Sequence, residues 1–294
     1  MILLKSFYFA SSSSEDNFFD LSKEGRMTCF NSYYPFRILS RKSFSCIDCD
    51  TPITILYGGN GSGKTTALNI IAEKLHLTRI ALYNRTQFLE QYLSLCSYKT
   101  DNQYPKKGAI ITSDDVFNYM LNVRAVNQDV DFNRKKLFEE YNKVISKPRR
   151  ELLHVNFEDE KSVKTFDKNM AIINNSKSGF VKKTMKNNVR EHSNGESALR
   201  YFMEKIEQNA LYLLDEPENS LSAKNQILLA KYIEDSAWAC DCQFIIATHS
   251  PFLLAMKRSK IYDLDDDPVS IKKWTELESI KCYRDFFKEH EQDK

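Results

Sequence analysis

Three groups of residues in this sequence have the types and spacing needed to bind and cleave a nucleoside triphosphate. The first is a glycine-rich loop, in which Gly58 to Thr65 fits the pattern G-x-x-x-x-G-K-[ST] between a β-branched run and a helical pattern. Glycines let backbone N–H groups converge on phosphate oxygens, and the helix N-terminus adds the positive end of its dipole. Four glycines, the lysine and both flanking elements favour this interpretation over a structural turn before a helix.

The roles within the loop follow from its chemistry. We expect Lys64 to reach the β- and γ-phosphates and the Thr65 hydroxyl to ligate Mg²⁺. The residues expected to bind the nucleotide are Gly58, Gly59, Asn60, Gly61, Ser62, Gly63, Lys64, Thr65 and Thr66.

The second group ends an apolar run, 211–214, with Asp215 and Glu216. Alone, this could be any strand that runs into an acidic turn. Beside a phosphate loop, Asp215 is suited to contact Mg²⁺, and Glu216 to accept a proton from the attacking water. A strand at 244–248 ends at His249; a lone histidine is more often structural, but this place favours a sensor of the γ-phosphate. The predicted catalytic residues are Glu216, His249 and Lys64.

The third group, Ser193-Asn-Gly195-Glu196-Ser197, opens a helical pattern. Ser193 and Glu196 have the spacing of a capping box, which is a structural role. A helix N-terminus that contains a glycine is also a site for phosphate, and both interpretations can hold together.

Hydrophobic patterning indicates the elements that must position these residues. Helical spacing begins near Val116 and Met120. Runs rich in Ile, Val, Tyr and Phe predict strands at 2–9, 37–46, 53–57, 80–83, 109–112, 211–214, 244–247 and 260–264. Strands that alternate with helices predict an α/β fold around a largely parallel sheet, which binds ligands beyond the carboxyl ends of its strands.

Length and charge indicate how the chain is organised. We expect a nucleotide-binding core in two parts, 1–113 and 191–294, around an inserted helical, Lys-rich lobe at 114–190. Residues 131–190 contain 15 Lys and Arg against 8 Asp and Glu, a balance of +7 in a chain of net charge +2. This segment is either a surface that binds nucleic acid or an acidic partner, or it is a solvated helical lobe rich in Lys. Its part 159–190 is expected to be mobile or to become ordered on contact with something else.

Composition excludes several classes of protein. With 42% hydrophobic and 28% charged residues, the chain is not disordered and can bury a core. No window holds 18 consecutive apolar residues, and Lys5 interrupts the apolar N-terminus, so we expect no membrane span, no signal peptide and a cytoplasmic location. The seven cysteines are expected to be reduced thiols, because no further Cys or His pair accompanies Cys46 and Cys49 or Cys240 and Cys242.

Together, these residues resemble the ATP-binding cassette (ABC) ATPases. The matches run in the family's order: Walker A at 58–65, the signature SNGES at 193–197, Walker B at 211–216, the D-loop at Ser220, Leu221 and Ser222, and the switch histidine at His249. Within the superfamily, the chain most resembles the stand-alone, non-transporter ATPases of the SMC, RecF and OLD type. The resemblance implies a P-loop NTPase fold with a largely parallel sheet, an N-terminal antiparallel β portion and an inserted helical lobe.

The resemblance also implies a mechanism. ATP and Mg²⁺ would be bound, and ATP hydrolysed to ADP and phosphate, by a head-to-tail homodimer with two ATP molecules at its interface. Each ATP would lie on the Walker A loop of one subunit and be closed by Ser193, Gly195 and Glu196 at the helix start of the other. Closure would depend on the γ-phosphate, which makes the dimer an ATP-timed switch.

The chain departs from the family pattern at several positions. His192 replaces the usual leucine of the signature, and Ser113 and Asp114 stand where the glutamine of the Q-loop is expected. Either Ser113 or Asp114 contacts the metal or water in its place, or the Q-loop glutamine is Gln87, Gln103 or Gln128. Tyr34 and Phe36 are candidates for stacking on adenine, against the alternative that they pack in the core.

Two functions from different classes fit these features. The first is an ATP-gated switch in DNA repair or anti-phage defence, which controls a separate effector such as a nuclease and contacts DNA or RNA through the basic 131–190 segment. The second is the nucleotide-binding subunit of a membrane transporter, which the Lys-rich insertion and the missing glutamine disfavour. A nucleotide sensor with negligible turnover is a third hypothesis, and Glu216 argues against it.

Overall fold

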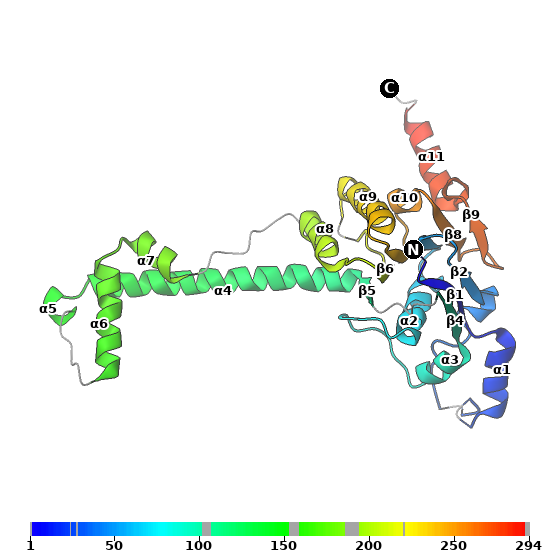
Figure 1. The fold of residues 1–294 in the computed structure, drawn as a ribbon, viewed down its shortest axis with the longest axis horizontal. Coiled ribbons are helices and arrows are strands. Elements are labelled where there is room, and N and C mark those ends of the chain that lie inside the picture. The colour runs from blue at the N-terminus through cyan, green and yellow to red at the C-terminus, as the bar shows by residue number, and fades with distance from the viewer. Residues whose placement is uncertain are drawn as a thin grey trace. The chain divides into compact units, whose positions relative to one another are not determined.

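The computed structural model describes residues 2–23, 25–27, 29–101, 107–152, 159–185, 194–219 and 221–291. The chain divides into two compact units, one formed by 1–117 with 193–294 and the other by 118–192. Figure 1 shows the elements of both. That the smaller unit is an inserted domain stays a prediction.

A six-stranded sheet forms the framework of the larger unit. In spatial order its strands are β5 (Gly108–Thr112), β6 (Leu211–Asp215), β7 (Gln243–Ala247), β3 (Ile53–Tyr57), β8 (Ser259–Asp263) and β9 (Ser270–Lys272). Neighbouring strands are parallel except that β9 is antiparallel to β8. Strands β3, β6 and β7 are buried at every residue, as expected of parallel strands that are covered on both faces. The predicted α/β fold with a largely parallel sheet is confirmed.

Helices pack directly on this sheet. Helix α2 (Lys64–Lys74) follows β3 and packs on β6 and β7, and α3 (Leu89–Leu95) packs on α2. Helix α9 (Ala223–Ala239) packs on β7 and contacts both α8 (Asn194–Lys205) and α10 (Pro251–Leu254). The C-terminal part holds the short 3-10 helix η2 (Trp274–Glu276) and α11 (Glu278–Glu291).

A smaller antiparallel sheet lies near the N-terminus, as predicted. Its order is β2 (Cys46–Asp48), β1 (Leu4–Tyr8) and β4 (Ser97–Thr100). The buried side chain of Gln243, the first residue of β7, joins the two sheets. Its Oε1 accepts the N–H groups of Leu3 and Leu4, both at 2.8 Å, and its Nε2 donates to the Leu4 carbonyl at 2.8 Å.

Aromatic side chains of helix α1 (Ser12–Leu21) and α3 pack together around Phe36. Phe36 is 5% exposed, stacks on Phe18 with ring centroids 4.5 Å apart, and meets Tyr92 edge-on at 5.1 Å. Phe36 is therefore a core residue, and its candidacy for adenine stacking is wrong. Tyr34 is only partly buried and has no ring partner within the described parts of the chain.

Two predicted strands are wrong. Within 37–46, residues Ser40–Lys42 form the 3-10 helix η1, and the positive φ angles of Arg37 (59°) and Ser43 (52°) exclude an extended strand. Residues 80–83 form no strand, and their side chains Ile80 and Leu82 are 65% and 96% exposed. Of the segment 37–46, only Cys46 belongs to a strand, β2, where it pairs with Tyr8 of β1.

The smaller unit is helical. Helix α4 (Ser113–Ile145) enters it at residue 118, and α5 (Arg149–Leu152), α6 (Glu160–Ile173) and α7 (Lys177–Thr184) follow. Ile172, Phe180 and Val181 are buried against Leu137, Phe138, Tyr141 and Val144 of α4. The expectation of mobility is therefore wrong for α6 and α7, whose apolar residues are buried together with those of α4.

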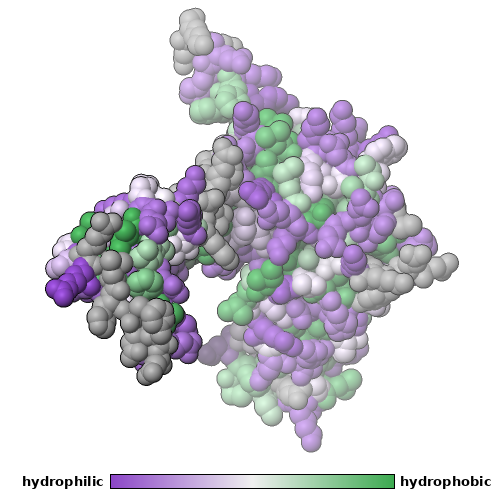
Figure 2. Space-filling model, turned by 60° about the vertical axis from the view of Figure 1, so that its left-hand side comes forward, coloured by the Kyte–Doolittle hydropathy of each residue, from purple (hydrophilic) through white to green (hydrophobic). Residues whose placement is uncertain are grey.

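The surface is mainly polar. Figure 2 shows hydrophilic residues over most of one face, with hydrophobic side chains in smaller patches. Among the helices in the described ranges, none combines the length and the apolar character that crossing a membrane requires.

Replacing Gln243 by leucine tests the joint between the two sheets. We expect the free energy of unfolding to fall by about 2–4 kcal/mol, because three buried backbone groups lose their partner. Urea denaturation followed by circular dichroism measures this change. The control is Gln87→Leu at an exposed position, and equal stability of the two variants would contradict the assigned role.

Candidate nucleotide-binding site

The phosphate loop lies between the end of β3 and the start of α2. Three of its glycines have positive φ angles, 152° at Gly58, 81° at Gly61 and 101° at Gly63. A Cβ atom at Gly58 would lie 2.8 Å from the Ser62 Oγ, so the turn needs glycine there. A pocket of about 460 Å³ opens at the loop, lined by Ile38, Asn60, Gly61, Ser62, Gly63, Lys64, Thr65, Thr66 and Glu216.

Lys64 is 4% exposed, and its ammonium is held by the protein itself. Its Nζ donates to the carbonyls of Gly58 at 2.6 Å and Gly59 at 3.1 Å, and it lies 2.9 Å from His249 Nε2. These contacts use all three N–H donors of the ammonium. Burial lowers the pKa of Lys64, while the nearby carboxylates of Glu216 and Asp215 act in the opposite direction.

Thr65 and Asp215 form an oxygen pair beside the loop. The Thr65 hydroxyl donates to Asp215 Oδ1 at 3.1 Å, and Asp215 is 8% exposed. Burial raises the pKa of Asp215 to about 6, although the hydrogen bond from Thr65 lowers it. One carboxylate and one hydroxyl suit Mg²⁺, which takes its other ligands from phosphates and water.

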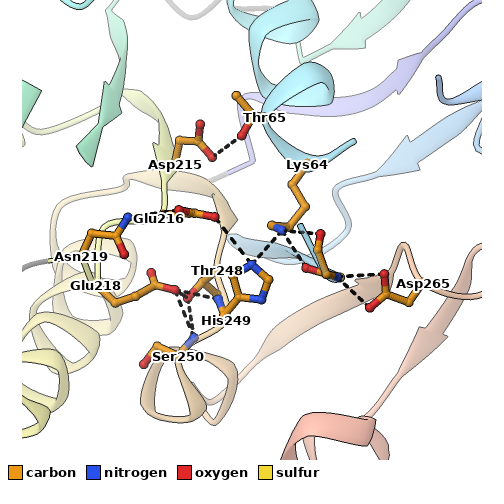
Figure 3. Close-up of polar contacts among 12 residues, drawn as sticks. Lys64, Thr65, Asp215, Glu216, Glu218, Asn219, Thr248, His249, Ser250 and Asp265 are labelled. Carbon is orange, nitrogen blue, oxygen red and sulfur yellow. Dashed lines mark hydrogen bonds and ion pairs between the residues drawn. The ribbon is translucent and has the colours of Figure 1, made fainter. Parts of the chain in front are cut away.

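Glu216 and His249 lie on the same side of the loop as Lys64 (Figure 3). Glu216 has a φ of 48°, its N–H donates to the Ala247 carbonyl at 2.9 Å, and its Oε2 accepts the Asn219 amide at 3.0 Å. Its Oε1 is 3.6 Å from His249 Nε2. Because Lys64 donates to Nε2, this nitrogen carries no proton when Lys64 is charged, and the His249 proton lies on Nδ1.

Glu218 positions the loop that carries His249, a role that the sequence reasoning missed. Its Oε1 accepts the Thr248 hydroxyl at 2.7 Å, the His249 N–H at 2.6 Å and the Ser250 N–H at 3.1 Å. The only signal in the sequence is a further acidic residue directly after Pro217. Asp265 was also missed: both of its carboxylate oxygens accept the Gly59 N–H.

The remaining candidates are less directly connected to the loop. Asp114 is exposed, whereas Asp115 is 3% exposed and accepts the Thr112 N–H at 2.8 Å. Gln87 and Gln128 are exposed, and Gln128 belongs to the smaller unit. His192, Ser193, Ser220 and Gln103 lie outside the described residues.

The start of α8 contains Gly195 and Glu196 in its first turn. Glu196 is exposed. In the described part of the chain, Glu196 does not line the pocket at the phosphate loop.

Comparisons with known proteins identify one family. The family model described as "ABC transporter" matches residues 50–219. A solved metal-chelate type ABC transporter in an inward-facing conformation is 16% identical and covers 79% of this chain and 76% of its own, with a TM-score of 0.38. The Smc head domain of Pyrococcus furiosus, with an extended coiled coil and bound to the C-terminal domain of ScpA, is 15% identical and covers 82% and 94%, with a TM-score of 0.40. No curated protein sequence matches.

Asp215→Asn tests the electrostatics of this site. A carboxyl whose pKa is raised in the folded state contributes stability at low pH that is lost as the pH rises through about 6. At pH 8 the asparagine variant should therefore be more stable than the original protein by about 1–3 kcal/mol, and the gain should vanish below pH 4. Denaturation at both pH values measures this, with exposed Asp235→Asn as control. A loss of stability at pH 8 would contradict the assignment.

Proposed function

The chain belongs to the ABC transporter family and is an ABC-type ATPase, and we propose that it is a stand-alone, ATP-gated dimeric switch. The observation that supports this proposal most is the convergence of Lys64, Thr65, Asp215, Glu216 and His249 at the carboxyl ends of β3, β6 and β7. These are the residue types that phosphoryl transfer to water needs: a cation, a metal ligand, a base and a sensor.

Each of these groups has one role in the proposed reaction. The loop N–H groups bind the phosphates, and Lys64 exchanges its bonds to Gly58 and Gly59 for the β- and γ-phosphates. Thr65 and Asp215 hold Mg²⁺, which neutralises charge on the β- and γ-phosphates when bound. Glu216 accepts the proton of the attacking water, and His249 Nε2, released by Lys64, faces the γ-phosphate.

The second half of each site comes from another subunit in this proposal. Ser193, which lies outside the described residues, would close on the γ-phosphate bound by the partner's Walker A loop, together with Gly195 and Glu196 in the first turn of α8. A helix N-terminus offers unsatisfied N–H groups and a positive dipole end to such an anion. ATP binding would then close a head-to-tail homodimer, and hydrolysis would open it.

Glu216→Gln separates binding from turnover. The variant should keep ATP binding, lose hydrolysis by at least about 100-fold because the base is gone, and accumulate as a dimer in ATP and Mg²⁺. Light scattering after size exclusion measures the mass, and phosphate release measures turnover. Lys64→Ala is the matched control, which should lose both nucleotide binding and the ATP-dependent dimer. A Glu216→Gln protein that stays monomeric would contradict the sandwich.

The biological output that we propose is DNA repair or anti-phage defence in the cytoplasm, through a separate effector such as a nuclease. Support comes from the basic segment 131–190, where lysines of α4, α6 and α7 are exposed, including Lys135, Lys136, Lys182 and Lys183. Clustered exposed lysines bind nucleic acid through its phosphates. A nucleotide-binding subunit of a membrane transporter is the alternative function.

Salt dependence of DNA binding tests the basic segment. Affinity for a short duplex should fall steeply with salt, and Lys182→Glu with Lys183→Glu should reduce the slope of log K against log salt by about 2. Fluorescence anisotropy measures both quantities. The same double change at exposed Lys281 and Lys288 of α11 is the control. A salt-independent affinity would exclude a phosphate-binding surface.

A further inference from the structure

The turn between β8 and β9 brings a carboxylate onto the phosphate loop. The Gly59 N–H donates to Asp265 Oδ1 at 2.8 Å and to Oδ2 at 2.7 Å (Figure 3). Asp263, the last residue of β8, and Asp266 of the turn share Lys272, at 2.9 and 2.7 Å. Within the described parts of the chain, Asp265 has no such ion pair, and its side chain is exposed. Its negative charge therefore acts on the loop without a direct ion pair, and at longer range it favours the charged form of Lys64.

Strand register places Asp265 at this position. Tyr57, the last residue of β3, pairs with Asp263, and the Leu264 N–H donates to the Tyr57 carbonyl at 2.8 Å. The Asp265 N–H donates to Asp263 Oδ1 at 3.0 Å, which fixes the start of the turn. The turn thus leaves β8 at the level where β3 enters the glycine loop, and Asp265 meets Gly59 as a consequence.

Asp265 and Lys64 contact the same residue of the loop from two sides. Gly59 gives its N–H to Asp265 and receives the Lys64 Nζ at its carbonyl at 3.1 Å. An N–H group of an anion-binding loop is therefore already used by an anion of the chain itself. A nucleotide that enters the loop brings several negative charges close to this carboxylate.

We propose that Asp265 is an intramolecular anion that competes with nucleotide phosphates for the loop and so sets its affinity for ATP. This inference rests on the proposed function, because it presupposes that ATP binds to this loop. Two like charges a few ångströms apart repel in a solvent-exposed site, and dissolved salt screens that repulsion. Removing the charge should therefore favour the nucleotide, most strongly at low salt.

Asp265→Asn isolates the charge, because the amide keeps the shape and an oxygen that can accept the Gly59 N–H. In titration calorimetry with Mg²⁺ and ATP, we expect Asp265→Asn to bind about three- to tenfold more tightly than the original protein at 50 mM salt. The gain should shrink at 500 mM salt and should be smaller for AMP, which carries fewer charges. Asp267→Asn, an exposed position in the same turn, is the control and should change little.

Asp265→Ala separates competition from a structural clamp. Competition predicts that the alanine variant also binds ATP more tightly, whereas a clamp that shapes the loop predicts weaker binding. Unchanged or weaker binding by both Asp265 variants, with ATP still bound by the original protein, would overturn the competition alone. Absence of ATP binding in all four proteins would overturn the proposed function, and the competition with it.

Discussion

The rest of the site depends on the hydrogen bonds that hold the buried ammonium of Lys64. A charge at 4% exposure needs partners, and here it has the Gly58 and Gly59 carbonyls and His249 Nε2. Carbonyls can face the ammonium only because the glycine loop turns back on itself. The carboxylates of Asp215 and Glu216 oppose the effect of burial on the pKa of Lys64. The acidic and basic groups of the site therefore stabilise one another's charged forms.

Strand order explains why these groups meet. The central strand β3 carries the phosphate loop and lies between β7 and β8. On one side, β7 delivers His249, and β6 beyond it delivers Asp215 and Glu216. On the other side, β8 leads into the turn that carries Asp265. Glu218 then fixes the loop after β7 through three hydrogen bonds, so that the His249 backbone is held independently of its ring.

The sequence was most informative where a residue's role depends on its immediate neighbours. Buried parallel strands read as continuous apolar runs, so 53–57, 211–214 and 244–247 were predicted within one residue of β3, β6 and β7. The prediction of a strand over 37–46 is wrong because the sequence carries no signal for the positive φ of Arg37 and Ser43.

Roles that depend on distant partners could not be predicted. Glu218 accepts hydrogen bonds from residues 30 to 32 positions away in the sequence, and Asp265 from a residue 206 positions away. Neither residue lies in a local sequence pattern that indicates its partner. The order of α6 and α7 within the helical lobe has the same cause, because their few apolar residues are buried only when they pack together against α4. In this site, the contacts that position the reacting residues are long-range, whereas the reacting residues themselves lie in local sequence motifs.

One measurement tests the central claim directly: a crystal structure of the protein with Mg²⁺ and a non-hydrolysable ATP analogue, compared with one grown without nucleotide. The account predicts that Lys64 Nζ leaves the Gly58 and Gly59 carbonyls and His249, and bonds to the β- and γ-phosphates, with Thr65 and Asp215 at the metal. An analogue bound elsewhere, or a Lys64 that keeps all three internal contacts beside a bound triphosphate, would contradict it.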